Sequence, residues 1–215
     1  RSEWWLRLIG ALIPGLITIW GTFQIGEQLI SKKVGWLAAL LLSTSSLHIF
    51  YSQELRPYSL ATMWAVLSWL MLIRTVKNIN AEGQNRSAHI SYLTFIFFSV
   101  LGIFTTYLYP FLFLSQLIYV LLCQRQFFKK MLLASLVLAL SFIPWLPIFS
   151  QQLRAGGAVR SGLPGWSEVV SFSQFKSVPM VLGKFLFGIV DLQFNWFYLI
   201  IVCLLLLWLA LIGWS

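Results

Sequence analysis

The chain has 215 residues, of which 59% are hydrophobic and only 10% charged, and its formal net charge is +9. Soluble domains are about a quarter charged, so this composition excludes an ordinary soluble domain. The mean hydropathy of +0.83, together with 11 tryptophans and 18 phenylalanines, predicts a polytopic helical membrane protein with aromatic residues at both interfaces. The basic residues are scattered between apolar segments, which argues against nucleic-acid binding.

A helix needs about 20 apolar residues to cross about 30 Å of hydrocarbon. The apolar segments that meet or approach this length are, in chain order, residues 6–24, 34–50, 59–73, 90–122, 131–149 and 196–214. Pro14 is expected to kink the first span, which membrane helices tolerate. Residues 74–89 are polar and are expected to form a solvent-exposed loop.

The apolar run over residues 90–122 is too long for one ordinary span, because it would form a helix of roughly 50 Å. Pro110 disfavours helical backbone at the residue before it. The sequence therefore predicts two short spans joined by a tight turn at Thr105–Pro110. With this division the expected fold is an all-α transmembrane bundle of about seven spans.

The expected organisation along the chain has three parts. Residues 1–149 form the transmembrane core with about six spans. Residues 150–195 form an outer loop, rich in glycine and serine, with an interfacial helix at about 179–194. Residues 196–215 form the last transmembrane helix. Because the chain begins with an arginine and stops directly after an apolar run, it is expected to be a fragment of a longer protein.

The distribution of charge predicts the orientation. Alternating spans place three basic loops on one side of the membrane, and their basic residues are Lys32, Lys33, Arg74, Lys77, Arg86, Arg125, Lys129 and Lys130. The short turns of the other side, residues 51–58 and 107–110, contain one basic residue, Arg56. Since basic loops are usually cytoplasmic, residues 51–58 are expected on the non-cytoplasmic side of the plasma (inner) membrane.

The outer turn at residues 51–58 has the densest set of chemically functional side chains in the sequence. Pro57 suits the first position of the following helix, where its missing N–H leaves no donor unpaired. The free backbone donors of that helix and the guanidinium of Arg56 would together suit a phosphate. Glu54 would orient Arg56, act as a base or bind a metal. The structural alternative is an interfacial ion pair between Glu54 and Arg56, with Tyr51 and Tyr58 in the aromatic belt.

The residues of this turn are Tyr51-Ser52-Gln53-Glu54-Leu55-Arg56-Pro57-Tyr58. They resemble a motif of membrane glycosyltransferases with the GT-C fold, in the family 39-like group of protein O-mannosyltransferases and aminoarabinose transferases. The similarity covers about residues 1–147, and this turn is its specific part. The resemblance implies a GT-C-like core that lacks its N-terminal part. It also implies sugar transfer from a polyprenyl-phosphate-linked donor to an acceptor protein, lipid or glycan.

The resemblance also implies site residues. The substrate-binding residues would be Tyr51, Gln53, Arg56, Tyr58 and Tyr107. The catalytic base would be an acidic residue upstream of Arg1, with Glu54 as the candidate within the chain, so the fragment alone is expected to be inactive. No cofactor is implied; a divalent metal stays open, although the two cysteines show no metal-ligand spacing.

Two other classes of protein also fit this sequence. A transporter or flippase for a lipid-linked or anionic solute would carry charged residues near the bilayer midplane and often inverted repeats. Here the charges are expected at the ends of the spans. A structural subunit of a membrane assembly is the third class. Substrate turnover without net transport would separate an enzyme from a transporter.

Overall fold

The computed structural model describes residues 2–54, 56–82 and 86–162, and the regular structure in these ranges is entirely helical. The chain divides into two compact units, one of residues 1–44 and 49–146 and the other of residues 45–48 and 147–215. The first unit contains the predicted site. The interfacial helix and the last span predicted after residue 163 lie outside the described residues.

The first span is one helical run with a change of winding. Helix α1 (Ser2–Arg7), the π-helix η1 (Leu8–Leu12) and α2 (Ile13–Leu29) follow one another directly. Pro14 has no N–H, and its ring interferes with the carbonyl four residues earlier. A wider π-helical turn just before it accommodates both effects. The disturbance expected at Pro14 therefore takes the form of a π-helical turn.

The second predicted span is interrupted. Helix α3 (Lys32–Thr44) is separate from the short helix α4 (Ser46–Tyr51), so the expectation of one helix over residues 34–50 is wrong. The 13 residues of α3 extend only about 20 Å. The hydroxyl groups of Ser43 and Thr44 both donate to the carbonyl of Leu40, at 2.9 Å. Local bonds of this kind from serine and threonine slightly destabilise a helix.

The polar segment after the third span is helical, so the expectation of a loop over residues 74–89 is wrong. Helix α5 (Tyr58–Glu82) continues through most of it, and α6 (Arg86–Thr105) begins shortly afterwards. Several of its described polar side chains bond to other helices; Arg74, for example, donates to Gln24 at 3.1 Å. Both helices therefore extend into the polar segment, and the end of α5 and the start of α6 lie inside it.

The predicted division of the long apolar run is confirmed. Helix α6 ends at Thr105, and α7 (Tyr109–Cys123) begins with Pro110 in its first turn. The described chain then continues as η2 (Arg125–Phe127), α8 (Phe128–Phe142), η3 (Ile143–Trp145) and α9 (Leu146–Gly162). Part of the outer loop expected from residue 150 is therefore helical.

Four helical runs in the described residues are long and apolar enough to cross a membrane: Trp4–Leu29, Tyr58–Ala81, Arg86–Thr105 and Arg125–Gly156. Helix α7 is apolar but shorter. Large apolar side chains are widely exposed on these helices and on α3, where Trp36 is 63% exposed and Leu40 60%. Apolar surface of this extent requires a lipid or protein cover. Of the seven or so spans expected, the described residues thus provide four of full length.

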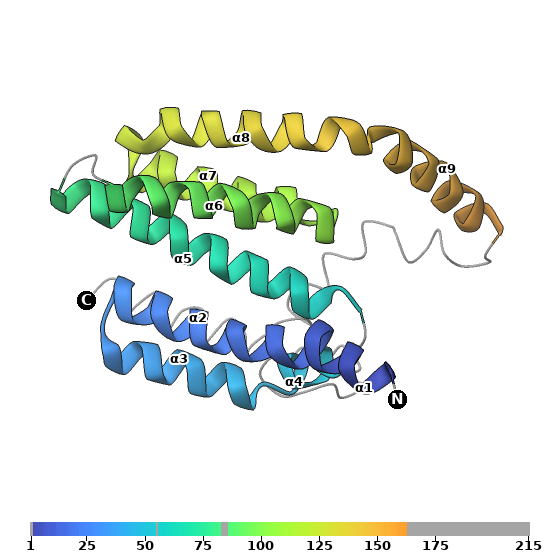
Figure 1. Ribbon diagram of the computed structural model, residues 1–215, viewed down its shortest axis with the longest axis horizontal. Helices are drawn as coiled ribbons and strands as arrows, with labels where there is room; N and C mark the ends of the chain where they lie inside the picture. Colours follow the sequence, from blue (N-terminus) through green and yellow to red (C-terminus); the bar gives the residue numbers. More distant parts are fainter. Residues whose placement is uncertain (1, 55, 83–85, 163–215) are drawn as a thin grey trace, which may run out of the picture. The chain divides into compact units, whose positions relative to one another are not determined.

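Helix α5 lies at the centre of the first unit, where it packs against α2 on one side and α6 on the other, and α3 pairs with α2 (Figure 1). The core between α5, α6, α7 and α8 is apolar and aromatic. Its fully buried side chains include Phe95, Leu72, Val120 and Met131.

Glycines allow close approach between helices, and the α2–α3 and α6–α7 contacts are two examples. A Cβ added to Gly35 of α3 would lie 2.6 Å from the carbonyl oxygen of Phe23 in α2, and one added to Gly26 would lie 2.8 Å from the Cα of Gly35. On α6, a Cβ at Gly102 would overlap the ring of Tyr109 in α7. Small residues drive helix association in membranes in this way, since packing replaces the hydrophobic effect there.

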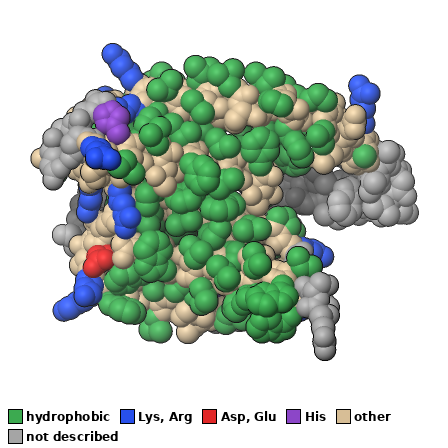
Figure 2. Space-filling model, in the orientation of Figure 1, with side chains coloured by type: hydrophobic (Ala, Val, Ile, Leu, Met, Phe, Trp, Pro, Cys, Tyr) green, Lys and Arg blue, Asp and Glu red, His purple; other side chains and the backbone are tan. Residues whose placement is uncertain are grey.

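Basic residues gather at one end of the first unit. The α2–α3, α5–α6 and α7–α8 connections lie at the same end in Figure 1, and lysine and arginine side chains concentrate there in Figure 2. Side chains link these connections: Lys77 donates to the carbonyl of Gln28, and Gln126 donates to Asn80 at 2.6 Å. The start of α5 and the α6–α7 turn lie at the opposite end.

Candidate functional site

The turn between α4 and α5 brings the two flanking tyrosines together. The rings of Tyr51 and Tyr58 meet edge to face with their centroids 4.9 Å apart. Within the turn, the backbone N–H of Gln53 donates to the carbonyl of Phe50 at 3.1 Å. Helix α5 begins at Tyr58, one residue later than expected. Pro57 precedes it and accepts the first helical hydrogen bond, from Ala61 at 2.8 Å.

Arg56 is held in place while its charge stays accessible. Its Nε lies 3.7 Å from Glu54 Oε2, and its side chain is 64% exposed. A hydrogen bond with the Tyr58 side chain, followed by the negative charge of Glu54, raises the pKa of the guanidinium above its ordinary value. The ion pair of the structural alternative is thus present. The exposed donors of Arg56 remain available to an anion, because a guanidinium carries five N–H groups.

Two oxygens in the turn are enclosed without a hydrogen-bond partner among the described residues: Ser52 Oγ and Glu54 Oε2. The 3.7 Å between Glu54 and Arg56 is longer than a hydrogen bond. An enclosed polar atom without a partner has lost its hydration, and this typically destabilises the fold by about 1–3 kcal/mol. Both oxygens are therefore suited to a ligand or to water.

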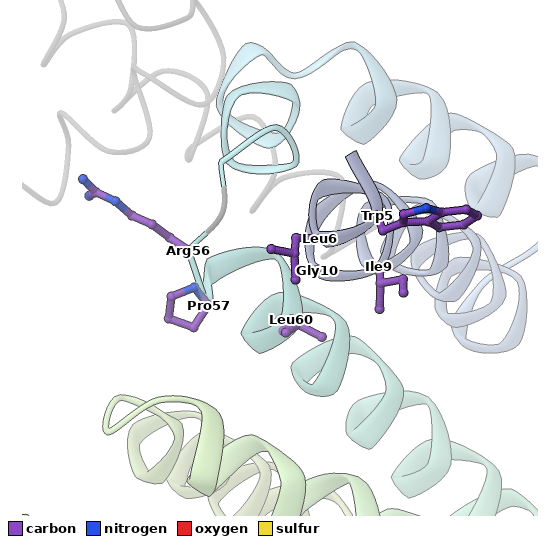
Figure 3. Close-up of a pocket in the computed structure, with 7 residues that line it drawn as sticks. All are labelled: Trp5, Leu6, Ile9, Gly10, Arg56, Pro57 and Leu60. Atoms are coloured by element: carbon purple, nitrogen blue, oxygen red, sulfur yellow. The ribbon is translucent and has the colours of Figure 1, made fainter. Parts of the chain in front are cut away.

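An apolar pocket of about 610 Å³ adjoins Arg56 (Figure 3). Its lining comes from α1, η1 and the start of α5, and consists of Trp5, Leu6, Ile9, Gly10, Arg56, Pro57 and Leu60. Arg56 is one of the lining residues, and Figure 3 shows its side chain extending away from Leu6 and Leu60, with the guanidinium directed out of the pocket. This arrangement matches an amphiphile with an apolar chain and an anionic head group.

The residues from the N-terminal helical run were missed as site residues. Trp4 and Trp5 lie just before the first apolar segment, and nothing local pairs them with a turn some fifty positions later. That pairing is tertiary: Ser59 Oγ, at the start of α5, donates to the carbonyl of Ala11 in η1 at 2.9 Å. The bond fixes the N-terminal run beside the turn.

Tyr107 belongs to a different group of side chains. It lies in the α6–α7 turn, where its hydroxyl accepts a hydrogen bond from the indole N–H of Trp145 at 3.1 Å. Trp145 also meets the ring of Phe104 edge to face, with the centroids 6.0 Å apart. The structure therefore brings Tyr51, Glu54, Arg56 and Tyr58 together, and places Tyr107 in a separate aromatic cluster.

In the described part of the chain, histidine, cysteine and acidic residues form no group of three or more that could bind a metal ion. Glu54 therefore has no such group around it there. Glu54 itself faces Arg56. The geometry favours orientation of the guanidinium as its role.

The expected orientation can be tested by cysteine labelling. In a chain with Cys123→Ser and Cys203→Ser, we expect Gln53→Cys to react with an impermeant maleimide from the non-cytoplasmic side and Lys33→Cys only from the cytoplasmic side. Both positions are exposed. The reverse pattern would contradict the orientation.

No protein-family model, curated protein or solved structure matches the chain. The fold itself defines the class: over the described residues, this is an all-helical membrane protein with four helices that suit a bilayer.

Proposed function

We propose that this protein is a membrane glycosyltransferase that moves a sugar from a polyprenyl-phosphate-linked donor to an acceptor on the non-cytoplasmic face. The observation that carries the proposal is the position of Arg56, a charged and accessible side chain among those that line an apolar pocket. The resemblance of the 51–58 turn to GT-C glycosyltransferases supplies the substrate class.

Arg56 would bind the donor phosphate and stabilise the charge that develops on it as the sugar departs. Preorganised donors are most effective at such a position, because they need no rearrangement during the reaction. Glu54 and Tyr58 hold the guanidinium. The lipid chain would lie against Leu6, Ile9 and their neighbours. The acceptor would lose its proton to a carboxylate base.

The second candidate is a transporter for a lipid-linked or anionic solute. One observation favours it: polar side chains are buried inside the bundle, where Gln116 donates to Ser68 at 2.8 Å. Interhelical bonds of this kind also serve helix association alone. The location of Arg56 at an end of the bundle, away from its middle, favours the enzyme.

The test uses the full-length protein reconstituted in vesicles with a polyprenyl-phosphate hexose or pentose and candidate acceptors. We expect release of the free lipid phosphate, coupled to glycosylation of an acceptor, with no net movement of the donor across the bilayer. Movement of intact donor across the bilayer without turnover would contradict the glycosyltransferase and support the transporter.

A further inference from the structure

A second, smaller pocket of about 260 Å³ lies beside the same turn. Its lining consists of Trp4, Arg7, Leu8, Leu12, Ser52 and Gln53. Like the pocket next to Arg56, it is lined by an arginine and a tryptophan, and it adds the hydroxyl of Ser52 and the amide of Gln53. Pockets that bind small polar ligands typically have such a composition, with a few placed polar groups on an apolar wall.

The two pockets lie on different faces of the same helical run and share the same turn. Neighbouring residues of α1 separate them, since Trp4 lines the smaller pocket and Trp5 the larger one. The turn contributes Ser52 and Gln53 to the smaller pocket and Arg56 to the larger. Both pockets therefore border the turn that contains Arg56.

The polar groups of the smaller pocket define its ligand. The hydroxyl oxygen of Ser52 is enclosed and has no hydrogen-bond partner in the described part of the chain. Serine and glutamine side chains both donate and accept hydrogen bonds, whereas arginine only donates. This set matches a molecule with several hydroxyl groups, each both donor and acceptor. The indole of Trp4 adds a flat apolar surface, which suits the C–H face of a sugar ring.

We propose that this smaller pocket is a monosaccharide subsite that holds the sugar of the donor, with Ser52, Gln53, Arg7 and Trp4 as its binding residues. The proposal rests on the proposed function for the identity of the donor. It assigns the sugar and the lipid chain to different faces of the N-terminal helical run, with the phosphate at Arg56 between them.

Binding to the full-length protein in lipid nanodiscs tests the subsite. The probes are farnesyl phosphate and farnesyl phosphates that carry glucose, mannose, galactose or arabinose. We expect at least one glycosylated probe to bind about tenfold more tightly than farnesyl phosphate, a difference worth about 1.4 kcal/mol. We expect each of Ser52→Ala, Gln53→Ala and Trp4→Ala to reduce the ratio of the two affinities to nearly one. The affinity for farnesyl phosphate should stay unchanged.

Two controls separate binding from folding. Trp20→Ala removes an indole that is exposed on α2 outside both pockets, and it should leave the sugar preference intact. Ser52→Ala removes an enclosed hydroxyl without a partner among the described residues, so it should leave the unfolding midpoint unchanged or raise it.

The results can show separately whether the subsite or the proposed role of Arg56 fails. A sugar preference that survives all three substitutions, or no preference for any of the glycosylated probes, would overturn the subsite. Arg56→Ala should weaken binding of glycosylated and unglycosylated probes equally. If Arg56→Ala affected neither probe while the sugar preference depended on Gln53, the subsite would stand, and the role of Arg56 in the proposed function would fail.

Discussion

Replacing Arg56 by alanine in the full-length protein is expected to lower kcat/KM for sugar transfer from the lipid donor about 100-fold to 1000-fold, the usual loss when one donor to a developing charge is removed. The side chain is exposed and oriented by Tyr58 and Glu54, so its loss removes an anion-binding group without disturbing the core. Steady-state transfer with a polyprenyl-phosphate sugar measures the effect.

Arg56→Lys refines this prediction. Lysine keeps the positive charge but lacks the planar fork that binds two phosphate oxygens at once. We therefore expect a rate between those of the wild type and Arg56→Ala. Arg86→Ala is the matched control, because Arg86 is also exposed but begins α6, at the opposite end of the first unit. Equal losses for Arg56→Ala and Arg86→Ala would point to a general effect of charge and contradict phosphate binding at the turn.

Gly35→Ala is expected to destabilise the fold by about 2 kcal/mol, within the range for overpacked interiors. A methyl group at Gly35 would lie 2.6 Å from the carbonyl oxygen of Phe23 and 3.0 Å from the backbone nitrogen of Glu27. Backbone atoms have no alternative rotamer, so α3 would have to move away from α2. Unfolding in mixed micelles at rising SDS fraction measures the change.

Gly156→Ala provides the control for this substitution. Gly156 of α9 is exposed, and a Cβ added there meets nothing within 4 Å. Alanine is favoured over glycine in a helix by about 0.5–1 kcal/mol, so Gly156→Ala should be neutral or slightly stabilising. An equal or smaller effect at Gly35 than at Gly156 would contradict the close packing of α2 against α3.

Features of the fold that depend on local chemistry were predictable from the sequence. Pro110 divides the long apolar run where expected, because proline restricts its own backbone and that of the preceding residue. The loop predicted over residues 74–89 was wrong because polar side chains can also lie on a helix. Asn78, for example, stays in α5 and donates to Ser87 of α6 at 3.1 Å. That partner is supplied by the tertiary fold, which hydropathy does not encode.

The candidate site divides in the same way. The pairing of Glu54 with Arg56, and of Tyr51 with Tyr58, lies within one short turn and could be predicted. The contribution of Trp5 and its neighbours could not, because it depends on a contact between η1 and α5. Tyr107 was expected in the site from the resemblance. Its hydroxyl accepts a hydrogen bond from Trp145, a tertiary contact that the sequence does not indicate, and its role in substrate binding stays a prediction.

A comparison of farnesyl phosphate with farnesol tests phosphate recognition at Arg56. The two molecules share the chain and differ in the anionic group. In nanodiscs that contain the full-length protein, we expect farnesyl phosphate to bind at least about tenfold more tightly than farnesol, a difference worth about 1.4 kcal/mol. Arg56→Ala should abolish this difference. Equal affinities in the wild type, or a phosphate preference that persists in Arg56→Ala, would contradict phosphate recognition at Arg56.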